Sequence, residues 1–156
     1  MALDERAICH EAGHAVAALH LGVHVERIEV TDRLPHSTIS RDSLEKKSTE
    51  QRCIVLAGGI AGEKFFYGDY DKEASQGDQN RISEMGGDDI RKYLVEALKI
   101  VSLHEVCLRE LKKQLISGWV RGESEASWES DCDSFELLSH EEIQCIWKGS
   151  CRERRV

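Results

Sequence analysis

The chain has 156 residues, a formal net charge of −8 and six cysteines. This length suits one domain with one hydrophobic core, here expected to span residues 1–156. An acidic chain is poorly matched to a phosphate backbone, so no nucleic-acid partner is expected. The sequence has no C-x-x-C pair and no N-terminal signal-peptide pattern, which favours reduced thiols and a cytoplasmic protein. The most apolar stretch, CIVLAGGIAG, is much shorter than the roughly 20 residues of a membrane span, so none is expected.

The first elements are predicted to be a helix and a short β element. Residues 3–22 predict a helix with Asp4 as the N-cap and Gly22 at its end. Residues 23–30 alternate in polarity and predict a strand, and a second strand is expected around 37–40.

The rest of the chain is predicted to be mostly helical. A helix is expected over 49–67, and a short helix over 78–85. A long amphipathic helix is expected to run from Asp88 or Asp89 to about residue 117. The acid-rich residues 121–136 predict a mobile, solvated loop before a last short helix that Ser139 and Glu142 begin as a capping box. The predicted fold class is therefore mainly α, with a small early β element and long C-terminal helices.

One motif on the first predicted helix points to metal chemistry. His10 and His14 are four residues apart, so their side chains lie on one helix face and both imidazoles can reach one ion. Glu11, next to the first histidine, is placed to act as a general base at the open position of that ion. This H-E-x-x-H arrangement is typical of zinc metalloproteases.

Glycines inside two predicted helices favour close contact between their backbones. Gly13 lies in the first helix, and Gly58, Gly59 and Gly62 lie in the helix over 49–67. A glycine inside a helix costs about 1 kcal/mol relative to alanine, so its presence needs a structural reason. We infer that the two helices pack against each other at short distance and that the second carries Glu63 toward the histidines.

A catalytic zinc ion needs a third protein ligand. The chemistry of the residues alone does not select it. The downstream candidates are the remaining histidines together with Glu63, Asp69, Asp71, Glu73 and Asp78.

Three segments resemble successive motifs of the FtsH family of ATP-dependent zinc proteases. They are HEAGHAVAA at 10–18, LAGGIAGEKFFYGD at 56–69 and QGDQNRIS at 76–83, and they occur in the family's order and at similar spacings. The C-terminal segment with LLSHEEIQCIW at 137–147 is also similar to the end of that peptidase domain. The resemblance implies a single FtsH-like zinc metallopeptidase domain over most of the chain.

The resemblance also assigns roles to individual residues. His10 and His14 match the family's two histidine ligands of zinc, and Asp78 matches its third ligand. Glu11 matches the catalytic base. Glu63 matches an acidic position of the second motif, where we expect it to orient a ligand or the reacting water.

The function implied is that of a zinc metalloendopeptidase that hydrolyses peptide bonds of unfolded or flexible polypeptides. The sequence lacks a G-x-x-x-x-G-K-[ST] motif, so hydrolysis by this chain is expected to be ATP-independent. A homo-oligomer, a separate ATPase and an adaptor are the partners that the resemblance suggests. Ile60 replaces the family's usual arginine and Gly62 a usual alanine, which puts substrate binding in doubt. The alternative is a catalytically weak or inactive FtsH-like module that binds or regulates a partner protein.

Overall fold

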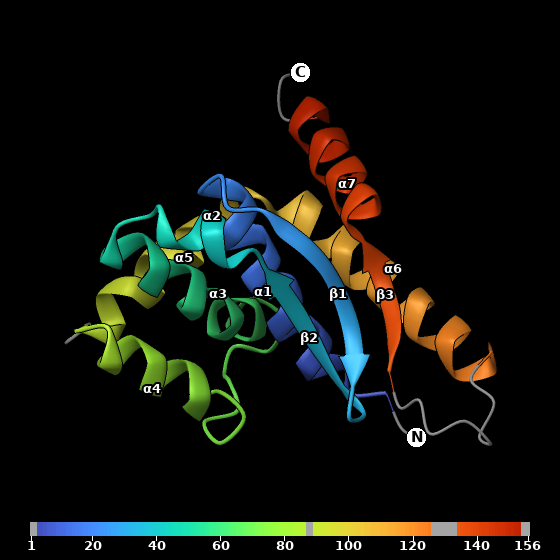
Figure 1. Cartoon of the computed structure of the whole chain (residues 1–156), viewed down its shortest axis with the longest axis horizontal. Coiled ribbons are helices and arrows are strands. Elements are labelled where there is room, and N and C mark those ends of the chain that lie inside the picture. The colour runs from blue at the N-terminus through green and yellow to red at the C-terminus, as the bar shows by residue number, and fades with distance from the viewer. Residues whose placement is uncertain (1–2, 87–88, 126–133, 154–156) are drawn as a thin grey trace.

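A computed structural model describes residues 3–86, 89–125 and 134–153. The fold is mainly α, as predicted, with one small antiparallel sheet (Figure 1). The elements in chain order are α1 (Glu5–His20), β1 (Val25–Thr31), β2 (Leu34–Ile39), α2 (Arg41–Glu45), α3 (Thr49–Tyr67), α4 (Gln76–Glu84), α5 (Ile90–Leu103), α6 (Glu105–Glu125), β3 (Phe135–Ser139) and α7 (His140–Glu153).

Helix α1 is the central element of the fold. Its predicted N-cap is confirmed, because the Asp4 side chain accepts a hydrogen bond from the backbone N–H of Ala7. The helix contacts α3, α6 and strand β2, and nearly all of its residues from Ile8 to Leu19 are buried. In Figure 1 it lies between the β1–β2 hairpin and α3. The histidines of α1 are therefore held on a helix that cannot shift without disturbing the core.

The sheet has the strand order β2-β1-β3, and both pairings are antiparallel. Ile28 in the central strand pairs with Ser37 of β2 and with Leu138 of β3. Strand β1 is hydrogen-bonded to a strand on each side, so β2 forms one edge of the sheet. Strand β2 also lies against α1. The sheet thus places a strand edge next to the helix that carries the H-E-x-x-H motif.

Helices α1 and α3 approach at backbone contact, as their glycines predict. A methyl group added at Gly13 would overlap the carbonyl oxygen of Gly58, and one added at Gly62 would overlap the carbonyl oxygen of Cys9. One added at Gly58 would lie 2.8 Å from the Cβ atom of Ala17. Larger residues at these positions would force the helices apart and move everything that α1 and α3 hold between them.

We expect Gly13→Ala to lower the free energy of unfolding by at least about 2 kcal/mol, because the added methyl group meets backbone atoms that cannot turn aside. Gly149→Ala in α7 is the matched control. It meets open space, so the better helix propensity of alanine should leave stability unchanged or raise it by up to about 1 kcal/mol. Urea unfolding followed by circular dichroism measures both. Equal stability of the two variants would contradict the close contact.

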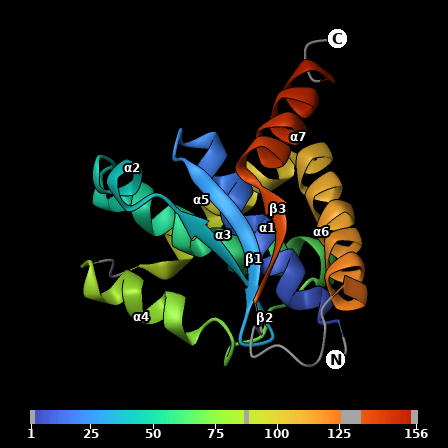
Figure 2. The ribbon, with the colours of Figure 1, turned by 45° about the vertical axis from the view of Figure 1, so that its right-hand side comes forward.

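Several predicted elements differ from the structure. The long helix is two helices, because α5 ends at Leu103 and α6 begins at Glu105. The loop expected at 121–136 is shorter at both ends: α6 continues to Glu125 and β3 begins at Phe135, while residues 126–133 lie outside the described part. Figure 2 shows α6 and α7 side by side, with α7 extending away from the α1–α3 pair.

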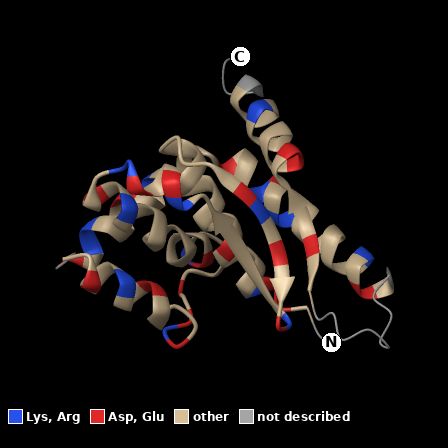
Figure 3. Ribbon diagram, in the orientation of Figure 1, with Lys and Arg blue, Asp and Glu red and all other residues tan. Residues whose placement is uncertain are grey.

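Charged residues of both signs are distributed over the described elements. Figure 3 shows lysines and arginines interspersed with acidic residues along the helices. Within the described ranges, no helix is both long enough and apolar enough to cross a bilayer.

Candidate metal centre

One line of residues on α3 holds the two histidines of α1. Val55, Gly59 and Glu63 are four residues apart, so they face the same side of α3. A methyl group at Gly59 would overlap the His10 ring, which shows how closely this imidazole fits against α3. The carboxylate Oε2 of Glu63 lies 2.7 Å from Nδ1 of His10, and the carbonyl oxygen of Val55 lies 2.9 Å from Nδ1 of His14. Helix α3 therefore fixes both rings through their Nδ1 atoms.

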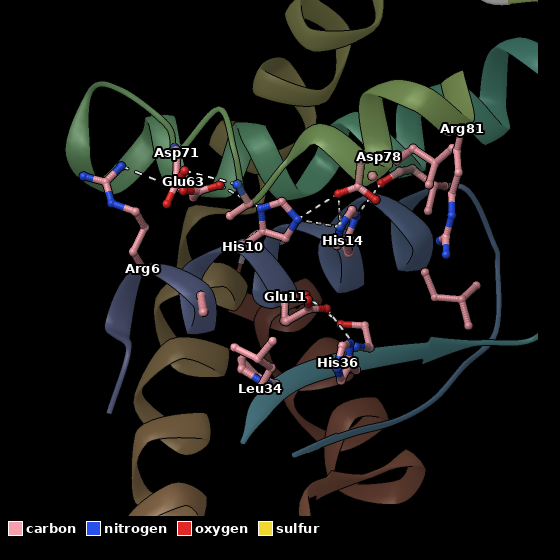
Figure 4. Close-up of a pocket in the computed structure, with 18 of the residues that line it drawn as sticks. Arg6, His10, Glu11, His14, Leu34, His36, Glu63, Asp71, Asp78 and Arg81 are labelled. Atoms are coloured by element: carbon pink, nitrogen blue, oxygen red, sulfur yellow. Dashed lines mark hydrogen bonds and ion pairs between the residues drawn. The ribbon is translucent and has the colours of Figure 1, made fainter. Parts of the chain in front are cut away.

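The other ring nitrogens converge with Asp78 at one point, as Figure 4 shows. Oδ2 of Asp78 lies 2.9 Å from Nε2 of His10 and 3.1 Å from Nε2 of His14, and the two Nε2 atoms are 3.0 Å apart. Asp78 lies in the first turn of α4, where a carboxylate is favoured by the helix dipole. Among the described residues, these three form the one group of His, Cys, Asp and Glu side chains with metal-binding proximity.

The hydrogen bonds at the Nδ1 atoms of His10 and His14 determine the protonation of their Nε2 atoms. A carboxylate and a backbone carbonyl oxygen only accept hydrogen bonds, so Nδ1 of His10 and Nδ1 of His14 each carry a proton. In a neutral imidazole the remaining nitrogen then has a free lone pair. When both imidazoles are neutral, the centre of the site is lined by two Nε2 lone pairs and a carboxylate oxygen, and such a group of acceptors is stabilised by a metal ion or a proton.

Without a metal ion, protons stabilise this group of acceptors. Burial of His10 lowers its pKa, but the hydrogen bonds with Asp78 and Glu63 outweigh this effect and raise the pKa to about 10. Burial likewise opposes protonation of His14, yet Asp78 raises its pKa overall. Burial of Asp78 favours its neutral form, but the two histidines hold the pKa of its carboxyl well below the usual range. A proton is held between three groups that are otherwise mutually repulsive.

The donor set fits zinc. Two imidazole nitrogens and one carboxylate oxygen are common ligands of a catalytic zinc ion, which keeps a fourth position open. A tetrahedral zinc ion with bonds of about 2.0–2.1 Å holds its ligand atoms about 3.3 Å apart, so the observed 2.9–3.1 Å requires only a small widening. The Nδ1 hydrogen bonds of both histidines are the outer contacts that metal-binding histidines ordinarily make.

Three of the other candidate acids from the sequence have their carboxylates bonded to groups outside the His10–His14–Asp78 triangle or behind it. The Asp69 carboxylate is 2.9 Å from the Arg6 guanidinium, at an exposed position. Oδ1 of Asp71 accepts hydrogen bonds from the backbone N–H groups of Glu73 and Ala74, and thereby stabilises the turn before α4. Oε1 of Glu63 accepts the backbone N–H of Asp71, so this glutamate joins the turn to His10.

Glu11 lies on the side of the site that faces strand β2. Its Oε2 atom accepts the backbone N–H of Ser37 at 2.7 Å, and the Ser37 hydroxyl donates to the backbone carbonyl of Glu11 at 3.0 Å. Glu11 and the three residues of the cluster line a single cavity of about 450 Å³ between α1, β2 and α4 (Figure 4). No pattern in the sequence indicates this contact of Ser37 with Glu11, because the bond to the carboxylate is made by the backbone N–H.

Comparison with known proteins relates a part of this chain to metalloproteases. Over 74 residues, the chain is 36% identical to ATP-dependent zinc metalloprotease FtsH 1 of Rhodopirellula baltica. The alignment covers 40% of this chain and 11% of that protein, so the chain spans about a tenth of its relative. No known family profile matches the chain. The similarity supports a distant FtsH-related region, and the cluster of His10, His14 and Asp78 is the feature of the structure that agrees with it.

Proposed function

We propose that this chain is a zinc metalloendopeptidase in which His10, His14 and Asp78 hold the ion. The observation that carries this proposal is the convergence of Nε2 of His10, Nε2 of His14 and Oδ2 of Asp78 within 3.1 Å of one another. The Nδ1 atoms of the two rings are bonded to Glu63 and Val55. The similarity to an FtsH metalloprotease supports the same class of reaction.

The reaction requires a nucleophile, a base and a proton donor for the leaving group. Zinc, when bound, supplies a Lewis acid that lowers the pKa of a water molecule to about 7 and polarises the scissile carbonyl. Glu11 accepts the proton of the attacking water and then delivers it to the nitrogen of the leaving amine. Glu63 and Val55 keep the imidazoles in the tautomer that leaves Nε2 unprotonated.

The shape of the cavity supports an extended polypeptide as the substrate. One wall is the edge strand β2, which contributes Leu34, Pro35 and Ser37 to the lining, and the opposite wall is α4. An extended peptide can lie along a strand edge and present a backbone carbonyl to the site, whereas a folded domain cannot enter a cavity of this size. We therefore propose unfolded or flexible segments as the substrate class.

The test is hydrolysis of an unfolded, labelled protein such as casein by the purified chain with one equivalent of zinc, in the absence of ATP. The expected result is endoproteolytic cleavage that stops on addition of a chelator and returns with zinc. A chain that binds zinc and leaves casein intact would contradict the proposed peptidase and favour the binding module considered above.

Zinc binding is expected to release protons, because the metal-free site holds them. At pH 7 the proton on His10, whose pKa is about 10, must leave before its Nε2 atom can bind zinc. The apparent dissociation constant should therefore fall about tenfold for each pH unit between 6 and 8 if one proton is released. Competition with a chromophoric chelator at several pH values measures this slope. A dissociation constant that does not change with pH would contradict the assignment of His10 as a ligand.

A further inference from the structure

The backbone of strand β2 contacts the proposed general base directly. Ser37 pairs with Ile28 of β1, but its N–H group donates to Oε2 of Glu11, so it points away from β1 toward α1. Charge-assisted hydrogen bonds of this kind, here 2.7 Å long, are shorter and stronger than neutral ones. The Ser37 hydroxyl holds the main chain of the same glutamate at 3.0 Å. One residue thus fixes both the carboxylate and the backbone of Glu11.

The site offers Glu11 little other support. Among the described residues, the hydrogen bonds of its side chain are confined to the Ser37 N–H, and the Glu63 and Asp78 carboxylates near it are bonded to histidines. A glutamate side chain has three rotatable bonds, so one oxygen must be anchored if the other is to face the cavity in a fixed direction.

We propose that Ser37 is a positioning residue that orients Glu11 for proton transfer through its backbone N–H. This inference rests on the proposed peptidase function and adds a residue that the H-E-x-x-H motif does not contain. Strand β2 then has two roles. A peptide is expected to lie along its edge, and its Ser37 N–H holds the base that acts on that peptide.

Ser37→Pro removes the N–H while keeping the strand. Proline is tolerated at a strand edge where the N–H does not pair with a neighbouring strand, and Pro35 already occupies the equivalent orientation two residues earlier. Ser37→Ala removes only the hydroxyl and is the matched control. We expect Ser37→Pro to lower kcat at least tenfold with KM changed less than threefold, and Ser37→Ala to stay within about threefold of the wild type in both. Zinc content and circular dichroism establish that each variant is folded and loaded.

A second readout does not depend on cleavage. In the zinc-loaded protein, hydrogen exchange at the Ser37 amide, followed by NMR, should accelerate at least tenfold on Glu11→Ala. The neighbouring Thr38 amide should keep its rate, because N–H directions alternate along a strand and Thr38 faces β1. Unchanged exchange at Ser37 would overturn the inference by itself. A Ser37→Pro variant with raised KM and normal kcat would also overturn it, by showing that the N–H serves the substrate. If the wild type itself cleaves nothing, the proposed function fails and the role of Ser37 fails with it.

Discussion

Glu11→Gln should abolish peptide hydrolysis while the chain keeps its zinc. General-base catalysis by a positioned side chain contributes about 10²–10⁴-fold, so kcat should fall by at least about 100-fold. The amide has nearly the shape of the carboxylate, and its carbonyl oxygen can still accept the N–H of Ser37. The variant therefore removes the base and leaves the contact with β2 and the metal ligands in place.

The measurement combines zinc content with turnover of a fluorogenic peptide taken from a casein cleavage site. Glu11 itself is absent from the His10–His14–Asp78 cluster, which is why zinc should remain at one equivalent per chain. Turnover retained within a few-fold would remove Glu11 from the mechanism. Loss of zinc together with turnover would show instead that Glu11 contributes to metal binding.

Asp78→Ala should weaken zinc binding by at least 100-fold. The substitution removes the one carboxylate that contacts both Nε2 atoms, and with it the negative charge that offsets the ion. Loss of an outer hydrogen-bond partner typically costs 10–100-fold in metal affinity, and loss of a ligand should exceed this range. Competition with a chelator of known affinity gives the value for each variant.

Two further variants make this result specific. Gly77→Ala lies next to Asp78 on α4 and meets open space, so it should keep the zinc affinity of the wild type. Glu63→Gln leaves one acceptor oxygen in place of two, so it weakens the hydrogen bond to Nδ1 of His10 or the one from the N–H of Asp71. Its zinc affinity should lie between those of the other two variants, about 10–100-fold below the wild type. An Asp78→Ala variant that binds zinc as well as Gly77→Ala would contradict the three-ligand site.

The elements that carry local signals could be predicted from the sequence. The cap of α1 at Asp4 and the capping box of α7 at Ser139 and Glu142 are both present, since each depends on contacts within one turn. The close approach of α1 and α3 followed from glycines that a free-standing helix would not favour. The break at His104 was missed because the apolar spacing continues across it, although the backbone of His104 is not helical.

The cluster of His10, His14 and Asp78 was predictable only in part. The pairing of His10 with His14 follows from helical spacing. The choice of Asp78 among several acids rested on resemblance, because only the tertiary packing of α4 brings Asp78 to the histidines. The roles of Val55 and Ser37 had no signal in the sequence. Both act through backbone atoms, and any residue type supplies a carbonyl, or an N–H unless it is proline. Strand β3 was missed because its pairing partner β1 lies more than a hundred residues earlier in the chain.

The most direct test of the central claim is X-ray absorption spectroscopy at the zinc edge of the chain loaded with one equivalent of zinc. The structure predicts two imidazole ligands and oxygen donors at about 2.0–2.1 Å, with no sulfur. The chain has six cysteines, so cysteine sulfur is the main alternative ligand for the zinc ion. A shell with sulfur at about 2.3 Å, or one without imidazole, would contradict a site built from His10, His14 and Asp78.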